Sequence, residues 1–263
     1  MTTKDRGLDL SNLSPAMALI IRSVLPVFTN HTDRPEHYGT CVLVELDGHP
    51  LIVTAAHVIE ETRKPANRFT VAVGGRLVTP LSRKALFTAP DNPMDIGVIP
   101  LSALQRDGFI EGGGVFLGAE MLDESEKGDG ADNQNTLANV YLPVGFPITR
   151  SRIQHSQLKI GLKTFSARVT LAPLYPASIA TTDQIVLEYE NLLLEGRKVD
   201  PPKLTGMSGG GVFRYQRRHP ETIKLVGILT SHEKRPRLMI GTKWGVAARI
   251  AREFIARYPE ALE

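Results

Sequence analysis

Short apolar runs separated by turn-forming residues recur along most of the chain. Runs rich in Val, Ile, Leu and Thr alternate with Gly, Pro, Asn and Asp, which favour turns over regular structure. Ten runs are predicted as strands: 39–46, 50–55, 69–73, 95–101, 140–146, 166–171, 184–189, 211–213, 224–230 and 238–246. Asp47-Gly48, between the first two, indicates a tight hairpin turn, because glycine adopts positive φ. Many short strands at this spacing favour a β-barrel or sandwich over a parallel α/β sheet.

Two helices are predicted near the ends of the chain. Ser14 precedes Pro15, which suits an N-cap followed by proline at the first helical position, and the helix should extend to about residue 21. Residues 246–258 place apolar side chains on one face at helical spacing, and Pro259 follows them. The second helix is therefore expected to be amphipathic and to pack on the body of the protein.

The composition changes between Gly118 and Asn135. Acidic residues alternate there with Gly and Asn, and almost nothing apolar follows Leu122. Such a stretch is typical of a solvated linker. It divides the chain into an N-terminal strand-rich half, residues 1–118, a linker, 119–136, and a C-terminal strand-rich half with the last helix, 137–263.

Composition and charge exclude several functional classes. The chain has 263 residues and a net charge of +3, which is too weak to favour a nucleic-acid partner. A single cysteine, Cys41, allows no internal disulfide and favours a reducing compartment. Residues 1–12 do not resemble a signal peptide, and the apolar run 16–21 is too short to span a bilayer. We expect a soluble, cytoplasmic protein without a membrane partner.

No cofactor or metal site is predicted. The chain contains no HExxH motif, and Cys41 has no second cysteine with which to form a zinc site. The glycine run 112–114 lacks the spacing of a dinucleotide-binding fingerprint and is interpreted as a turn.

The residues needed for nucleophilic hydrolysis by serine are present. This chemistry requires a hydroxyl, a base, an acid that orients the base, and donors for the oxyanion. His57 follows an apolar run that ends in two alanines, whereas the other six histidines lie in polar, loop-like contexts. His57 is the candidate base, and a purely structural histidine is the alternative interpretation.

Candidates for the acid and the nucleophile occur further along the chain. Asp95 opens an apolar strand, where a charge needs a partner such as an imidazolium, although a turn-capping aspartate would look the same. Ser208 lies between glycines that permit a sharp turn, with the backbone N–H groups of Gly206 and Ser208 as oxyanion donors. A glycine-rich turn with an incidental serine is the alternative there.

The segment 206–210 also fits G-x-S-x-G, the nucleophile motif of α/β-hydrolase esterases. That interpretation is disfavoured because a helix should follow the serine, and the glycines at 209–211 do not favour one. The order histidine, acid, serine is instead the order found in chymotrypsin.

Three segments resemble the signature segments of the trypsin-like serine peptidases: Thr54-Ala-Ala-His57, Asp95-Ile-Gly-Val and Gly206-Met-Ser208-Gly-Gly. Residues 226–230 resemble the strand that holds extended substrate in this family, and the C-terminal region resembles its last strand and helix. The similarity covers roughly residues 24–258 and is closest to bacterial-type intracellular members without disulfides.

This resemblance implies an all-β fold of two six-stranded antiparallel β-barrels of the chymotrypsin type with a C-terminal amphipathic helix. His57 and Asp95 would come from the first barrel and Ser208 from the second, with a cleft between them. The implied activity is that of a serine endopeptidase acting on a protein or peptide substrate. A catalytically silent module that binds an extended peptide as an added strand is the alternative, and a regulatory protein is a further candidate partner.

Two departures from the family pattern stand out. Cys41 faces Val58 where the family usually has a disulfide, so a buried thiol is expected. Met207 replaces the acidic residue that pairs with a new N-terminus in secreted members. Activation of that kind is therefore not expected, and the oxyanion loop must be held by packing or ordered by a partner.

The resemblance also implies a set of residues in or near the primary specificity pocket: Pro202, Lys203, Thr230, Ser231 and His232. Asp200 could take the place of Pro202 only if the loop is offset. His232 and Lys203 would favour an acidic substrate side chain, and a small apolar one is equally compatible with the sequence.

Overall fold

The computed structural model describes residues 15–31, 34–62, 64, 68–78, 87–88, 94–125, 139–148, 152–154, 157–159, 163–164, 168–169, 182–189, 192–194, 197–199, 203–233 and 237–259. Asp200, Pro202 and residues 126–136 of the predicted linker lie outside them.

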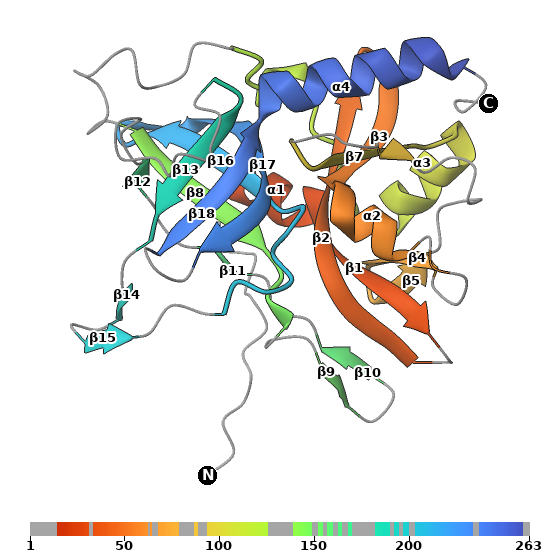
Figure 1. The fold of residues 1–263 in the computed structure, drawn as a ribbon, viewed down its shortest axis with the longest axis horizontal. Coiled ribbons are helices and arrows are strands. Elements are labelled where there is room, and N and C mark those ends of the chain that lie inside the picture. Colours follow the sequence, from red (N-terminus) through yellow and green to blue (C-terminus); the bar gives the residue numbers. More distant parts are fainter. Residues whose placement is uncertain are drawn as a thin grey trace.

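The N-terminal half forms one antiparallel sheet with the strand order β5-β4-β1-β2-β3-β7-β6 (Figure 1). Its strands are β1 (Val24–His31), β2 (Arg34–Leu46), β3 (His49–Ala55), β4 (Phe69–Val73), β5 (Arg76–Val78), β6 (Phe87–Thr88) and β7 (Ile96–Pro100). The predicted hairpin turn joins β2 to β3, with Asp47 at φ 51° and Gly48 at φ 81°. Two residues of positive φ suit the twist of adjacent antiparallel strands.

The C-terminal half forms a second antiparallel sheet with the order β11-β8-β16-β17-β18-β13-β12. Its strands are β8 (Asn139–Gly145), β11 (Lys163–Thr164), β12 (Arg168–Val169), β13 (Gln184–Glu188), β16 (Gly211–Gln216), β17 (His219–Glu233) and β18 (Leu238–Lys243). Two further strand pairs are β9 (Arg152–Gln154) with β10 (Gln157–Lys159), and β14 (Leu192–Leu194) with β15 (Arg197–Val199).

The all-β architecture with two antiparallel sheets is confirmed. Among the described residues each sheet has seven strands rather than the six expected. The difference arises at the sheet edges, where β5, β6, β11 and β12 are only two or three residues long.

In the part of the chain that the structure describes, the sheets are accompanied by the α-helices α1 (Pro15–Ser23), α2 (Ala56–Thr62), α3 (Ala103–Glu111) and α4 (Trp244–Arg257) and by the 3₁₀ helix η3 (Ala119–Met121). Helix α2 begins directly after β3, so His57 lies in the first turn of a helix rather than at the end of a strand. Helix α4 begins at Trp244, within the region predicted as the last strand, and the Trp244 side chain is fully buried.

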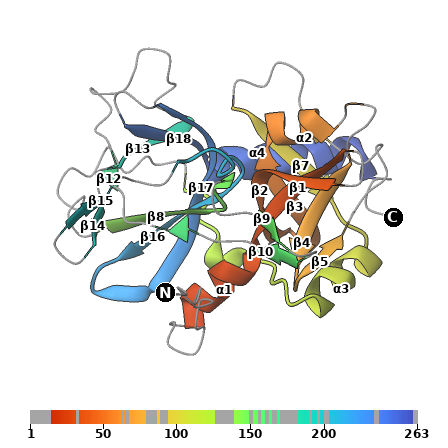
Figure 2. The ribbon, with the colours of Figure 1, turned by 90° about the horizontal axis from the view of Figure 1, so that it is seen from below.

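The two sheets meet in one apolar cluster, and each half also has an apolar cluster of its own. A single cluster of buried residues joins side chains of β2, β3 and β7 to side chains of β8, β16 and β17. Figures 1 and 2 both show the sheets side by side, and in Figure 1 α4 begins above β17 and extends over the N-terminal sheet. Arg252 on α4 contacts Asp47 in the β2–β3 turn at 2.7 Å and Glu124 at 2.7 Å. The last helix therefore ties the C-terminal half to the N-terminal sheet.

The first residues of the predicted linker pack against the second sheet. Met121 and Leu122 are buried, and Leu122 forms a β-bridge with Leu225 of β17. The carboxylate of Asp123 accepts a hydrogen bond from Arg214 of β16. Residues 121–123 are thus anchored, and the division of the chain at 119 and 136 stays a prediction.

Candidate active site

His57 and Asp95 are held together by two contacts. The Asp95 Oδ2 atom lies 2.7 Å from His57 Nδ1, and Asp95 Oδ1 accepts the backbone N–H of His57 at 3.0 Å. The Asp95 carbonyl also accepts the N–H of Ala56 at 2.9 Å. These bonds tie the first turn of α2 to the residue that precedes β7. They fix both the position and the rotation of the imidazole ring.

The backbone of Asp95 is in the left-handed region, at φ 52°. Aspartate tolerates this conformation better than most residues with a side chain. The three hydrogen bonds around Asp95 explain why the conformation persists. With Nδ1–H donating to the carboxylate, the neutral imidazole carries its lone pair on Nε2, which is the atom a base would use.

Hydrogen bonds hold the backbone of the loop that carries Ser208. Four consecutive carbonyls, those of residues 205–208, accept hydrogen bonds from Ile148 N (2.8 Å), Thr40 Oγ1 (2.8 Å), Gly210 N (2.9 Å) and Thr40 N (2.8 Å), in that order. The N–H groups of residues 207 and 209 donate to Leu204 O (2.9 Å) and Leu229 O (2.7 Å). Each peptide plane from 205–206 to 208–209 is therefore held.

Two N–H groups of this loop stand apart. Within the described part of the chain, those of Gly206 and Ser208 donate to no protein acceptor. Because N–H and C=O point in opposite directions across a trans peptide, the bonds to Thr205 O and Met207 O also orient these two donors. Gly206, at φ 94°, and Gly209, at φ 86°, provide the positive φ values that the turn requires.

The Ser208 loop lies against the segment that carries His57. A Cβ atom at Gly39 would meet Val58 Cγ2 at 2.8 Å and the Ser208 carbonyl at 3.2 Å, so both groups lie next to the same residue of β2. Both residues are described, yet no hydrogen bond joins the Ser208 hydroxyl to the His57 ring. The structure pairs His57 with Asp95 and brings the Ser208 loop beside them, and the complete triad stays a proposal.

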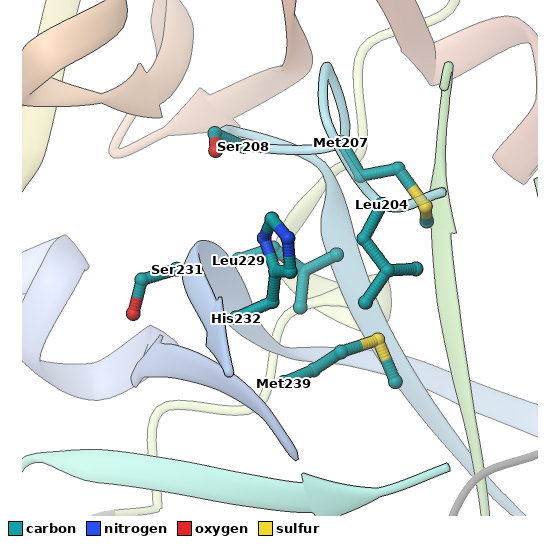
Figure 3. Close-up of a pocket in the computed structure, with 7 residues that line it drawn as sticks. All are labelled: Leu204, Met207, Ser208, Leu229, Ser231, His232 and Met239. Atoms are coloured by element: carbon teal, nitrogen blue, oxygen red, sulfur yellow. The ribbon is translucent and has the colours of Figure 1, made fainter. Parts of the chain in front are cut away.

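A small pocket opens beside Ser208 (Figure 3). The space between its lining residues is about 210 Å³ with the open solvent at its mouth counted, and it is lined by Leu204, Met207, Ser208, Leu229, Ser231, His232 and Met239. The four apolar members are each at most 5% exposed. In Figure 3 the Ser231 hydroxyl points away from these apolar side chains. The pocket therefore has an apolar interior, with polar groups contributed by Ser208, Ser231 and His232.

The predicted pocket residues have different positions in the structure. Ser231 and His232 line the pocket. Thr230 does not line it, because its side chain is buried and donates to the Ile240 carbonyl at 3.2 Å. Lys203 is exposed and is not part of the lining, and Pro202 lies outside the described residues.

Sequence reasoning missed the apolar lining. Met207 was interpreted only as the replacement of an acid, yet its buried side chain lines the pocket and lies beside Gly145. Met239 lies opposite His232 in the β17–β18 pairing. A sequence analysis that paired these two strands as a hairpin would have placed Met239 beside the pocket.

The remaining histidines differ from the prediction. His31, His37, His49, His219 and His232 lie in strands rather than in loops, and His155 lies outside the described residues. His37, two residues before Gly39, packs on Phe28 and its Nε2 lies 2.8 Å from the Gly39 carbonyl. Among the described residues its buried Nδ1 has no hydrogen-bond partner. Burial lowers the pKa of His37 from 6.5 to about 4.

This histidine should make stability fall in mild acid. Between pH 6.5 and about 4 the unfolded chain binds a proton at His37 that the folded chain does not, so folding becomes less favourable. The loss should approach about 3 kcal/mol at the lower limit. We expect urea unfolding at pH 7.5 and 4.5 to show that the free energy of unfolding decreases less on acidification in His37→Gln than in the wild type. Equal losses would contradict this prediction.

Cys41 is a buried thiol, as expected, and burial raises the pKa of the thiol. It belongs to the same apolar cluster as Val58, but the position of β2 directly against Val58 is that of Gly39. No group of three or more potential metal-binding side chains occurs in the described ranges. None of the described helices combines the length and apolar character needed to cross a membrane.

Comparison with known proteins identifies the fold. No protein-family model and no curated protein sequence matches the chain. The crystal structure of the thermostable serine protease AL20 from an extremophilic microorganism is similar, with a TM-score of 0.53 at 13% sequence identity, and the match covers 90% of this chain and 97% of that one. The tobacco vein mottling virus protease also matches, with a TM-score of 0.46 at 11% identity over 85% and 77% of the two chains. The chain therefore has the chymotrypsin-like fold of two antiparallel β-barrels followed by a C-terminal helix.

Proposed function

We propose that this protein is a serine endopeptidase in which Ser208 is the nucleophile, His57 the general base and Asp95 the residue that orients the base. The observation that carries the proposal is the two-point contact between Asp95 and His57 beside a serine loop. The two unpaired N–H groups of that loop support it, because an oxyanion requires donors that are free and held in place.

The proposed reaction has two halves. The Ser208 Oγ atom attacks the carbonyl carbon of the substrate while its proton passes to His57 Nε2, and the resulting oxyanion accepts hydrogen bonds from the N–H groups of Gly206 and Ser208. Collapse of this intermediate breaks the C–N bond, and His57 gives its proton to the leaving amine. Water then attacks the acyl-enzyme, with His57 again taking and returning the proton, and releases the carboxylate product.

Asp95 orients and stabilises the base in the proposed reaction. Its carboxylate accepts from Nδ1 and stabilises the imidazolium that forms when His57 takes the proton. The second oxygen accepts the backbone N–H of His57, so the carboxylate keeps its orientation relative to the ring.

The pocket beside Ser208 favours an uncharged, apolar substrate side chain. Because Ser208 lines the pocket, the side chain next to the attacked carbonyl would enter it. A carboxylate or an ammonium group would lose its hydration there among Leu204, Met207, Leu229 and Met239. We therefore propose the apolar alternative over the acidic one. Of the two residues that would favour an acidic side chain, His232 lines the pocket, but Lys203 is exposed and outside the lining.

Substrate profiling should show this preference. In a peptide library we expect cleavage after Leu or Met to exceed cleavage after Asp, Glu or Lys by about 10- to 100-fold in kcat/KM, since burying an unpaired charge is costly. Met239→Ala should enlarge the pocket and shift preference toward Phe. Met121→Ala, a buried methionine outside the pocket, should leave the profile unchanged. A preference for charged side chains, or no shift in Met239→Ala, would contradict this assignment.

A silent peptide-binding module is the second candidate. The observation in its favour is that the Ser208 hydroxyl and the His57 ring are not hydrogen-bonded to each other in the described structure. Such a module would bind extended peptide along an exposed strand without turnover. Mass spectrometry of a peptide library incubated with the wild type and with Ser208→Ala separates the two, because only a peptidase yields fragments that the variant does not.

The cytoplasmic location and the regulatory protein partner stay predictions. Neither follows from the geometry of the site.

A further inference from the structure

Thr40 of β2 is fully buried where the two sheets meet, and it makes four hydrogen bonds there. Its N–H donates to the Ser208 carbonyl at 2.8 Å, and its Oγ1 donates to the Gly206 carbonyl at 2.8 Å. The same Oγ1 accepts the N–H of Phe146 at 3.0 Å, while the Thr40 carbonyl accepts the hydroxyl of Thr54 at 2.6 Å. One residue of the N-terminal sheet therefore holds two carbonyls of the serine loop.

The position of these two carbonyls matters for the unpaired N–H groups. The peptide between Gly206 and Met207 joins the two peptides whose N–H groups are the proposed oxyanion donors. When Thr40 Oγ1 holds the Gly206 carbonyl, it sets the direction of one donor relative to the other. Glycine at 206 offers little resistance to rotation by itself, so the restraint has to come from this bond and from the bonds around it.

The serine loop also packs tightly on the same threonines. A Cβ atom at Gly209 would lie 2.0 Å from the Thr40 carbonyl oxygen and 2.0 Å from Thr54 Oγ1. The backbone after Ser208 is thus in direct contact with Thr40 and Thr54. Met207 carries no charge, so an ion pair at that residue cannot hold the loop.

We infer that Thr40 is a positioning residue that keeps the oxyanion donors of Gly206 and Ser208 preformed across the interface between the two sheets. The inference rests on the proposed peptidase function. Thr40 does not touch the substrate. It acts through the Gly206 and Ser208 carbonyls. Its hydroxyl holds the loop in place of an ion pair, which the uncharged Met207 cannot form.

The decisive comparison is between two substitutions of Thr40. Thr40→Val keeps the shape of the side chain but leaves the Gly206 carbonyl and the Phe146 N–H without their partner. Thr40→Ser keeps the hydroxyl. We expect kcat to fall about 10- to 100-fold in the valine variant with KM nearly unchanged, because the oxyanion exists only in the transition state. The Thr40→Ser variant should keep kcat within about threefold of the wild type.

Ser23→Ala is the matched control. Ser23 is another fully buried hydroxyl that donates to one backbone carbonyl, that of Ile20, but it lies on α1 away from the loop. The control should lose stability without a change in kcat. A fall in kcat of equal size in Ser23→Ala and Thr40→Val would reduce Thr40 to a structural role and overturn the inference, as would a folded Thr40→Val enzyme with the kcat of the wild type.

Thr54→Val provides a second variant in case Thr40→Val does not fold. It removes only the bond to the Thr40 carbonyl, so a smaller fall in kcat at unchanged KM supports the inference, and an unchanged kcat overturns it.

Hydrogen exchange of the peptide 204–210 separates this inference from the proposed function. Faster exchange in Thr40→Val than in Ser23→Ala supports positioning by Thr40 even if the wild type shows no peptidase activity, an outcome that defeats only the proposed function. Equal exchange in the two variants overturns the inference whether or not the protein is a peptidase.

Discussion

Replacement of Ser208 by alanine should abolish peptide hydrolysis while leaving the fold intact. Knocking out the nucleophile of a serine protease costs about 10⁵- to 10⁶-fold in kcat, and the remaining donors and pocket preserve only a weak rate above that of water. The hydroxyl forms no hydrogen bond in the described structure, so its loss should change stability little. The measurement is kcat/KM on a peptide in which Leu supplies the carbonyl of the cleaved bond. The melting temperature of each variant is measured as well.

Ser125→Ala serves as the control for this substitution. Ser125 is exposed, and among the described residues its hydrogen bonds are to Asp123. It should retain full activity. Residual hydrolysis in Ser208→Ala above about one part in 10³ of the wild type would show that another group performs the chemistry.

Asp95→Asn should lower kcat by about 10³- to 10⁴-fold with a small change in KM. The asparagine oxygen can still accept the His57 backbone N–H, which turns its NH₂ group toward Nδ1. An NH₂ group at that position favours the tautomer with the proton on Nε2, and Nε2 can then no longer act as a base. The geometry of the loop would stay the same while the base is disabled.

Asp47→Asn is a closely matched control for Asp95→Asn. Asp47 and Asp95 are the two residues other than glycine with positive φ in the described structure, and Asp47 pairs with Arg252 away from the site. The same chemical change in the same backbone conformation should leave kcat unchanged. Equal losses in both variants would place the effect in folding rather than in the orientation of His57.

Much of the fold was predictable because several strands are continuous apolar runs between clear turn signals. Phe69–Val73 coincides with β4, and Asp47-Gly48 forms the predicted turn. Strand β1 was missed although it lies between β4 and β2 in the sheet, because Pro26, Thr29 and Asn30 interrupt its apolar pattern. Burial between neighbouring strands, rather than intrinsic propensity, makes this segment a strand.

Two helices were missed for different reasons. Helix α2 contains β-branched residues such as Val58 and Ile59, which have low helix propensity, and their burial in the core stabilises the helix instead. Helix α3 contains Gly108 and has a weak apolar face, but the sequence at its N-terminus indicates where it begins. Ser102 and Gln105 form a capping box, with bonds of 3.4 and 2.9 Å.

The candidate site was predictable where local sequence determines chemistry, and not where it depends on distant contacts. The glycines around Ser208 indicate the sharp turn that they form, whereas the alanines before His57 give no sign of the helix that begins at Ala56. Thr40 lies 166 residues from Gly206, and nothing in its neighbourhood indicates that its hydroxyl reaches that carbonyl. The pocket lining likewise depends on the β17–β18 register rather than on any one segment.

The most direct test of the proposed chemistry is to locate the adduct of a fluorophosphonate on the native protein by mass spectrometry. A peptidase that uses Ser208 and His57 should carry one adduct, on Ser208, and His57→Ala should remove it while Asp47→Asn retains it. No adduct under conditions that label a known serine peptidase, or an adduct on Ser208 that persists in His57→Ala, would contradict the assignment.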